Sequence, residues 1–144
     1  MKPVAALGLD IGRKRIGVAG CDRLGLSVTE LTTLEGLPFA EIVTQLQTLV
    51  DARQVDILVV GLPYAMDGSL GKQARKVQGF AQRLSQALGL PIEYVDERLT
   101  SYQAEQMLWS AGKSPVRHKA LVDQKAAAII LQQWLDQKSP PSPA

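Results

Sequence analysis

Two short apolar segments, residues 4–10 and 16–21, follow each other with only a basic turn containing Gly12 between them. Two extended runs this close together are typical of an antiparallel hairpin. Residues 27–34 are rich in threonine and valine, and we expect them to form a third strand. The chain is therefore predicted to open with three antiparallel strands.

The rest of the chain alternates helical patterns with short apolar runs. Helices are predicted, largely from the spacing of their apolar residues, at residues 39–53, 72–88, 101–111 and 119–135. Strands are predicted at residues 56–61 and 92–96, where the first run is apolar enough to be buried on both faces of a sheet. A hairpin followed by strand–helix crossovers predicts an α/β fold with a mixed sheet of about five strands and helices on both faces.

The length of 144 residues suits one domain, which we assign to residues 1–137. Residues 138–144 are rich in proline and serine, and we expect this tail to be disordered. No apolar run approaches the ~18–20 residues of a membrane span, and the N-terminus lacks the pattern of a signal peptide. These features favour the cytoplasm and predict no membrane partner.

Metal sites built from cysteine or several histidines are excluded by composition. The chain has one cysteine, Cys21, and one histidine, His118. It can therefore form neither an internal disulfide framework nor a cysteine-cluster zinc site. Cys21 is most simply a small buried apolar residue.

Basic residues are clustered, although the net charge is only +2. Residues 68–92 and 106–122 contain no acid, and a third cluster follows Gly12. This distribution suggests an anionic partner, while solvated surface charge is the alternative. The candidate nucleic-acid-binding residues in these clusters are Arg13, Lys14, Arg15, Lys72, Arg75, Lys76, Lys113, Arg117 and Lys119.

Carboxylates stand at three positions that packing explains poorly. Asp10 ends the first apolar run, Glu97 follows the strand at 92–96, and Asp123 lies in the last helical segment. Ligands of α/β sheets bind at the carboxyl ends of strands. The alternatives are that Asp10 begins a turn, that Glu97 complements a helix N-terminus, and that Asp123 pairs with Lys119 along one helix face.

Considered together, the three acids suggest a single site. If the strands ending at Asp10 and Glu97 run parallel, both acids project from one sheet edge, where a packed helix could add Asp123. Converging carboxylates repel one another unless cations separate them, and Mg²⁺ or Mn²⁺ prefers oxygen ligands. Two such ions about 4 Å apart could clamp a phosphodiester during hydrolysis, with the basic clusters holding its phosphates.

The sequence also predicts the surroundings of Gly61 and of the two tryptophans. Gly61, at the end of the strand at 56–61, permits close approach of a phosphate or of a neighbouring backbone, or belongs to a plain loop. Trp109 and Trp134 have apolar neighbours at helical spacing and are expected in the core rather than as base-stacking platforms.

Four motifs in order make the chain resemble the YqgF (RuvX) family: Leu9-Asp10-Ile11-Gly12 with Arg15-Ile16-Gly17-Val18-Ala19, Val60-Gly61-Leu62-Pro63 with Asp67-Gly68, Asp96-Glu97-Arg98-Leu99-Thr100, and Lys119 with Asp123-Gln124-Lys125-Ala126-Ala127. The resemblance implies a ribonuclease H-like fold, a cytoplasmic location and a metal-dependent nuclease that matures the 5′ end of 16S rRNA. It places the family's acidic triad on Asp10, Glu97 and Asp123. It also places Arg98 and Lys119 at positions facing substrate.

Other functions remain open at this point. A Holliday junction resolvase could use the same chemistry on branched DNA, and it would require a dimer with two sites. The chain could instead be a non-catalytic or partner-dependent RNA-binding module in ribosome biogenesis, acting on a ribosome precursor. The Asp-x-Gly hairpin also resembles that of actin-like ATPases, but those need two such domains.

Overall fold

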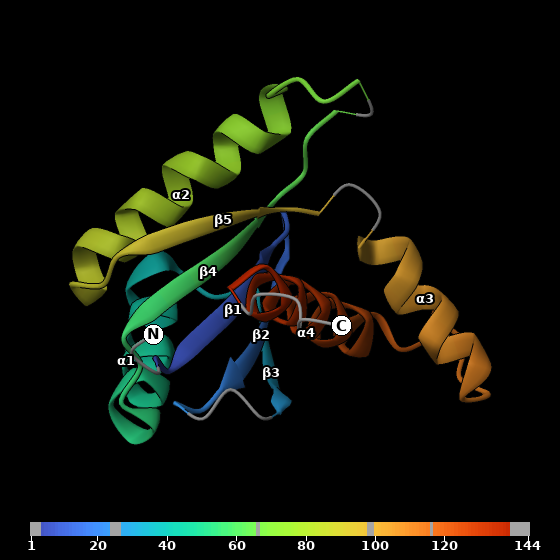
Figure 1. Ribbon diagram of the computed structural model, residues 1–144, viewed down its shortest axis with the longest axis horizontal. Helices are drawn as coiled ribbons and strands as arrows, with labels where there is room; N and C mark the ends of the chain where they lie inside the picture. The colour runs from blue at the N-terminus through green and yellow to red at the C-terminus, as the bar shows by residue number, and fades with distance from the viewer. Residues whose placement is uncertain (1–3, 24–26, 66, 98–99, 116, 139–144) are drawn as a thin grey trace, which may run out of the picture.

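The computed structural model describes residues 4–23, 27–65, 67–97, 100–115 and 117–138 (Figure 1). The predicted order of strands and helices is confirmed. The elements are β1 (Ala6–Ile11), β2 (Arg15–Cys21), β3 (Val28–Glu35), α1 (Phe39–Arg53), β4 (Ile57–Leu62), α2 (Lys72–Leu88), β5 (Ile92–Asp96), α3 (Thr100–Ser110) and α4 (Lys119–Lys138). Helix α4 therefore includes Lys138, a residue that was expected to belong to the tail. Residues 139–144 lie outside the described part.

The five strands form one mixed sheet in the order β3-β2-β1-β4-β5. The pairs β1–β2 and β2–β3 are antiparallel, whereas β1–β4 and β4–β5 are parallel. The expected mixed α/β fold is thus confirmed. Because β1, β4 and β5 run in the same direction, their carboxyl ends meet at one edge, with β4 between the other two.

Helices cover both faces of the sheet, as predicted (Figure 1). Alternate residues of β1 divide between the two cores, because successive side chains of a strand point to opposite faces. Leu7 and Leu9 pack with α1 and α2, while Ala6 packs with α4. Cys21 is fully buried on the α4 side, as expected for a small apolar residue.

Helix α4 lies directly on the backbone of β1 and β2. A Cβ built on Gly8 would lie 2.9 Å from the Ala127 carbonyl oxygen, and one built on Gly17 would lie 1.9 Å from the Asp123 carbonyl oxygen. Only glycine allows this approach. The Thr33 hydroxyl also donates a 2.7 Å hydrogen bond to the Ala120 carbonyl, which ties the start of α4 to β3.

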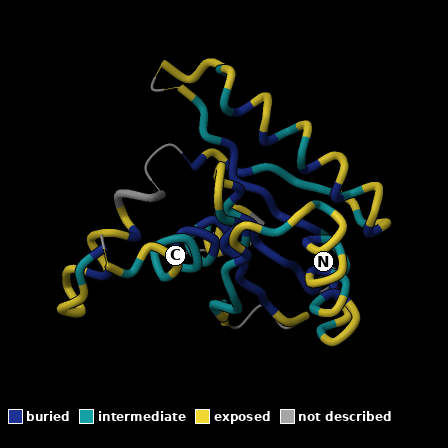
Figure 2. Tube along the Cα trace, turned by 180° about the vertical axis from the view of Figure 1, so that it is seen from behind, coloured by how far each residue is buried: buried dark blue, intermediate teal, exposed yellow. Residues whose placement is uncertain are grey.

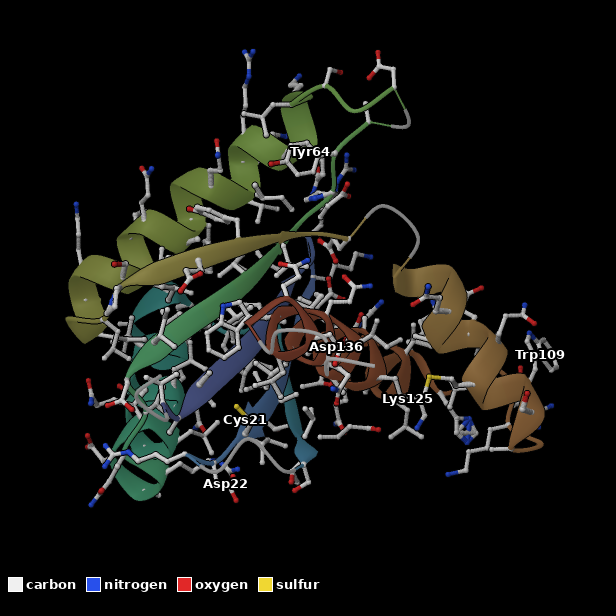
Figure 3. The ribbon with its side chains drawn as sticks, in the orientation of Figure 1. Cys21, Asp22, Tyr64, Trp109, Lys125 and Asp136 are labelled. Atoms are coloured by element: carbon white, nitrogen blue, oxygen red, sulfur yellow. The ribbon has the colours of Figure 1, made fainter. Side chains whose placement is uncertain are left out.

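Helix α3 packs against α4 and extends beyond the edge of the sheet (Figures 1 and 2). Ala104 and Leu108 are buried in this contact, whereas Met107 is exposed. Trp134 lies in the core, as predicted, but the prediction for Trp109 is wrong, since 58% of it is exposed. Figure 3 shows Trp109 on the far side of α3 from the sheet. Helical spacing could not reveal that α3 has only one covered side.

None of the helices in the described residues combines the length and the hydropathy needed to cross a bilayer.

Candidate active site

Asp10 and Glu97 meet at the sheet edge, from β1 and from the residue after β5. The two strands are not neighbours, because β4 runs between them. The side chains nevertheless share a hydrogen bond, in which Glu97 donates and Asp10 accepts. The Glu97 main-chain N–H also donates a 3.0 Å hydrogen bond to the Leu62 carbonyl, which fixes the chain just beyond β5.

Gly61 of β4 makes room for this pair. A Cβ at this position would lie 2.8 Å from Glu97 Cδ and 2.5 Å from Ile130 Cδ1. The structure therefore shows Gly61 as a position of close approach by other groups. The approaching groups are the side chains of Glu97 and Ile130 rather than a neighbouring backbone.

The two carboxyl groups hold a proton at neutral pH. Burial is the main cause that raises the pKa of Glu97 to about 9, and the negative charge of Asp10 adds to it. Burial also raises the pKa of Asp10 to about 6, with a contribution from the Asp123 charge, although the hydrogen bond from Glu97 opposes the increase. Burial and mutual repulsion thus favour one protonated carboxyl over two ionised ones in this pair.

Asp123 lies beside this pair but is bound to Arg15. The Arg15 Nε donates a 2.6 Å hydrogen bond to Asp123 Oδ2, and Arg15 Nη1 lies 3.7 Å from Glu35 Oε2. Burial raises the pKa of Asp123, while Arg15 opposes that shift. The helix-face partner suggested for Asp123, Lys119, is exposed, and the described ion pair uses Arg15 instead.

The donor set at this edge fits a divalent cation in part. Within the described ranges, no three acidic, histidine or cysteine side chains are grouped so that they could hold a metal ion as they stand. Asp10 and Glu97 supply adjacent carboxyl oxygens, and a bound Mg²⁺ or Mn²⁺ could take the place of the proton that burial and mutual repulsion favour there. Asp123 could join them, although Arg15 would compete with a cation for its Oδ2 atom.

The predicted basic residues fall into two separate regions. Arg13 and Lys14 form the turn between β1 and β2, and Lys76 of α2 shares a cavity with them. Lys72 and Arg75 occupy the first turn of the same helix. The second region is the connection between α3 and α4, which Figure 1 shows well separated from α2, and it holds Lys113, Arg117 and Lys119. Arg98 lies outside the described residues.

The cavity beneath the β1–β2 turn is a feature that sequence reasoning missed. Its volume is about 550 Å³, and it is lined by the turn, the end of β3 and the first turns of α2. These segments are far apart along the chain and share no motif, so only the basic character of the turn pointed towards this region.

The chain is similar to known proteins over nearly its whole length. The family model described as "RuvX: Holliday junction resolvase" matches residues 4–137. A relative from Trichormus variabilis, named "Putative pre-16S rRNA nuclease", is 65% identical over 135 residues, which cover 94% of this chain and 89% of the relative. A Synechococcus elongatus protein of the same name is 61% identical over 137 residues, covering 95% and 92%.

Solved structures show the same fold at low identity. RuvC from T. thermophilus, in complex with a Holliday junction substrate, has a TM-score of 0.56 at 14% identity, covering 94% of this chain and 96% of that one. The Fowlpox virus resolvase with Holliday junction DNA has a TM-score of 0.58 at 9% identity, covering 94% and 99%. At these identities the likeness extends to the fold alone.

Proposed function

Because the chain belongs to the RuvX family, we propose that it is a metal-dependent endonuclease that hydrolyses phosphodiester bonds in structured nucleic acid. The observation that carries this proposal is the Asp10–Glu97 pair at the common end of the parallel strands, with Asp123 on the helix above it. Three acids at one sheet edge, beside a basic turn, suit a negatively charged substrate and a positively charged cofactor.

We assign the metal ligands as Asp10, Glu97 and Asp123, and the cofactor as Mg²⁺ or Mn²⁺, bound as two ions. When bound, such ions polarise phosphate oxygens and activate water. Asp10 and Glu97 would give up their shared proton on binding, because a cation lowers the pKa of its carboxylate ligands. Arg15 would release Asp123 and bind a phosphate oxygen of the substrate, since a guanidinium pairs well with phosphate.

The proposed substrate is the 5′ segment of precursor 16S rRNA. Its support is the name of the relatives, which are up to 65% identical, and the basic side chains of Arg13 and Lys14 next to Asp10. These two side chains are exposed and lie where a phosphate backbone could pass over the sheet edge. Such contacts hold the strand in place without reading its sequence.

The direct test is cleavage of a labelled precursor segment with Mn²⁺, comparing the wild type with Asp10→Asn. Asp51→Asn is the matched control, because Asp51 is an exposed acid on α1 that hydrogen-bonds within its own helix. We expect cleavage by the wild type and Asp51→Asn and at least a 100-fold loss in Asp10→Asn. RNA binding without cleavage under any metal would favour a binding module instead.

Junction resolution is a second candidate, supported by the description of the RuvX family as Holliday junction resolvases and by the fold that the chain shares with two resolvases. It requires two sites related by symmetry on a four-way junction. Cleavage of a synthetic DNA junction, measured together with the mass of the protein in solution, separates the candidates. A monomer that cuts the precursor RNA and leaves the junction intact would exclude this second function.

A further inference from the structure

The cavity under the β1–β2 turn has an apolar interior and a basic rim. Its interior is formed on the α1–α2 side of the sheet by Ile11, Ile16, Leu34, Ile42, Val77 and Phe80. Its volume of about 550 Å³ is within the range of about 300–1,000 Å³ that is typical of small-molecule sites. It is therefore large enough for a nucleotide and apolar enough to take its base.

The rim is strongly cationic. Arg13, Lys14 and Lys76 contribute to it, against the carboxylate of Glu35, whereas Arg15 also lines the cavity but its guanidinium is bound to Asp123. Glu35 is 3.7 Å from Arg15, so part of its charge is already balanced. Of the remaining cations, Arg13, Lys14 and Lys76 are exposed and available to a phosphate.

One aromatic wall of the cavity is held in place. The Phe80 ring lies 5.7 Å from that of Phe39 in an edge-to-face arrangement. The Arg83 guanidinium in turn lies 4.0 Å from the centroid of the Phe39 ring. Phe80 is thus a preorganised stacking surface, and Gln73, two turns earlier on α2, lines the same cavity with an amide that can both donate and accept hydrogen bonds.

The cavity and the acids lie on opposite faces of the same hairpin. Asp10 faces α4, whereas the next residue, Ile11, faces the cavity. Only Gly12, Arg13 and Lys14 separate the strands of the hairpin. A nucleic-acid strand that crosses this turn can therefore present a phosphate to the acids and a neighbouring base to the cavity.

We propose that the cavity is a nucleotide subsite, which takes one unstacked base of the substrate against Phe80 while Arg13, Lys14 and Lys76 hold its phosphate. This deepens the proposed function and rests on it for the identity of the strand. It predicts that cleavage requires an unpaired nucleotide near the scissile bond. An apolar protein side chain would fill the same volume, but it would leave the cationic rim without a partner.

The first test measures binding of nucleoside 5′-monophosphates by calorimetry, with ribose 5-phosphate and inorganic phosphate as probes that lack a base. We expect at least one mononucleotide to bind about tenfold more tightly than ribose 5-phosphate, because base stacking contributes that much. Equal binding of all the probes would overturn the proposal, since it would show a basic rim that holds phosphate only.

Two variants locate that binding. Phe80→Ala removes the stacking surface, and Gln73→Trp fills the cavity from a partly exposed position without removing a core side chain. Both variants should bind the mononucleotide about tenfold more weakly than the wild type. The matched control Gln82→Trp, on the exposed side of the same helix, should keep the wild-type affinity. Unchanged affinity in a folded Gln73→Trp protein would contradict the proposal.

The second test uses an RNA hairpin with a single unpaired 2-aminopurine, bound to Asp10→Asn so that cleavage does not interfere. Insertion of this base should change its fluorescence, and Gln73→Trp should abolish the change. Mononucleotide binding without any RNA cleavage would count against the nuclease and not against the subsite. RNA cleavage that is unaffected by Gln73→Trp, with no fluorescence change, would overturn the subsite and leave the nuclease intact.

Discussion

The Arg15 guanidinium holds the Asp123 carboxylate through a 2.6 Å hydrogen bond across 108 positions of the chain. The same carboxylate is the third acid that a metal site at this edge would need. Arg15 therefore places a positive charge where a divalent cation would bind. Arg15 thus competes with a cation for the Oδ2 atom of Asp123.

Replacement of this arginine should strengthen metal binding. Arg15→Gln removes the competing charge, so we expect Mn²⁺ to bind about fivefold more tightly, corresponding to about 1 kcal/mol. Calorimetric titration of the protein without substrate measures this directly. Arg23→Gln is the control, since Arg23 forms an exposed ion pair with Asp56 away from the acids. Weaker Mn²⁺ binding in Arg15→Gln would mean that Arg15 positions Asp123 for the metal.

Metal-free stability should fall as pH rises. The pKa of Glu97 is raised to about 9 and that of Asp10 to about 6, so the folded state binds protons more tightly than the unfolded state. The two protonated groups stabilise the fold fully below their ordinary pKa values of 4.5 for Glu97 and 3.8 for Asp10, and this stabilisation is lost as the pH rises to about 9. Denaturant unfolding in EDTA between pH 5 and pH 9 should show this slope.

Removal of the Glu97 charge should flatten that slope. We expect Glu97→Gln to be more stable than the wild type at pH 8 by roughly 1–3 kcal/mol, because folding of the variant no longer has to take up a proton that the unfolded chain releases above the ordinary pKa of 4.5. Glu105→Gln, at an exposed position on α3, should keep the wild-type slope. If Glu97→Gln and the wild type showed the same pH dependence, Glu97 would not be the group responsible.

Added metal should stabilise the fold through Asp10. At a Mn²⁺ concentration 100 times the dissociation constant, binding adds about 2.7 kcal/mol. That corresponds to an increase of about 5–10 °C in Tm for a chain of this size. Asp10→Asn should lose most of the increase, while Asp51→Asn should retain it. An equal increase in all three proteins would place the metal elsewhere.

A methyl group at position 61 should disturb the acid pair. Gly61→Ala brings a Cβ to within 2.8 Å of Glu97 Cδ, so we expect a loss of roughly 1–3 kcal/mol and weaker Mn²⁺ binding. The control is Gly79→Ala on α2, where a Cβ meets nothing within 4 Å. That substitution should stabilise the protein by about 0.5–1 kcal/mol, as alanine favours helix more than glycine does. Chemical denaturation compares the two variants.

The fold was predictable from sequence because its signals are local. A hairpin connection and two strand–helix crossovers fix most of the strand order, and the shared direction of β1, β4 and β5 follows from the crossovers. The same reasoning places Asp10 and Glu97 at one edge. It could not show that β4 lies between them, nor that Gly61 leaves the space in which they meet.

Contacts between distant segments were not predictable. Helical spacing offered Lys119 as the partner of Asp123, while Arg15 became close only when α4 packed on β2. The prediction that Trp109 lies in the core was wrong for a related reason, because the amphipathic pattern of α3 does not show how much of the helix a neighbour covers. The cavity likewise exists only once the hairpin, β3 and α2 are assembled.

The glycine at position 17 also decides how the site can move. The β2 backbone lies directly against the main chain of Asp123, so α4 has no room to move closer to the sheet. Exchange of Arg15 for a cation then needs only the rotation of a side chain, that of Asp123 or that of Arg15, beside a stationary helix. Rotamer changes of this kind take picoseconds to nanoseconds at accessible side chains, whereas helix shifts take microseconds to milliseconds. Assembly of the third ligand would thus be fast compared with capture of the nucleic acid.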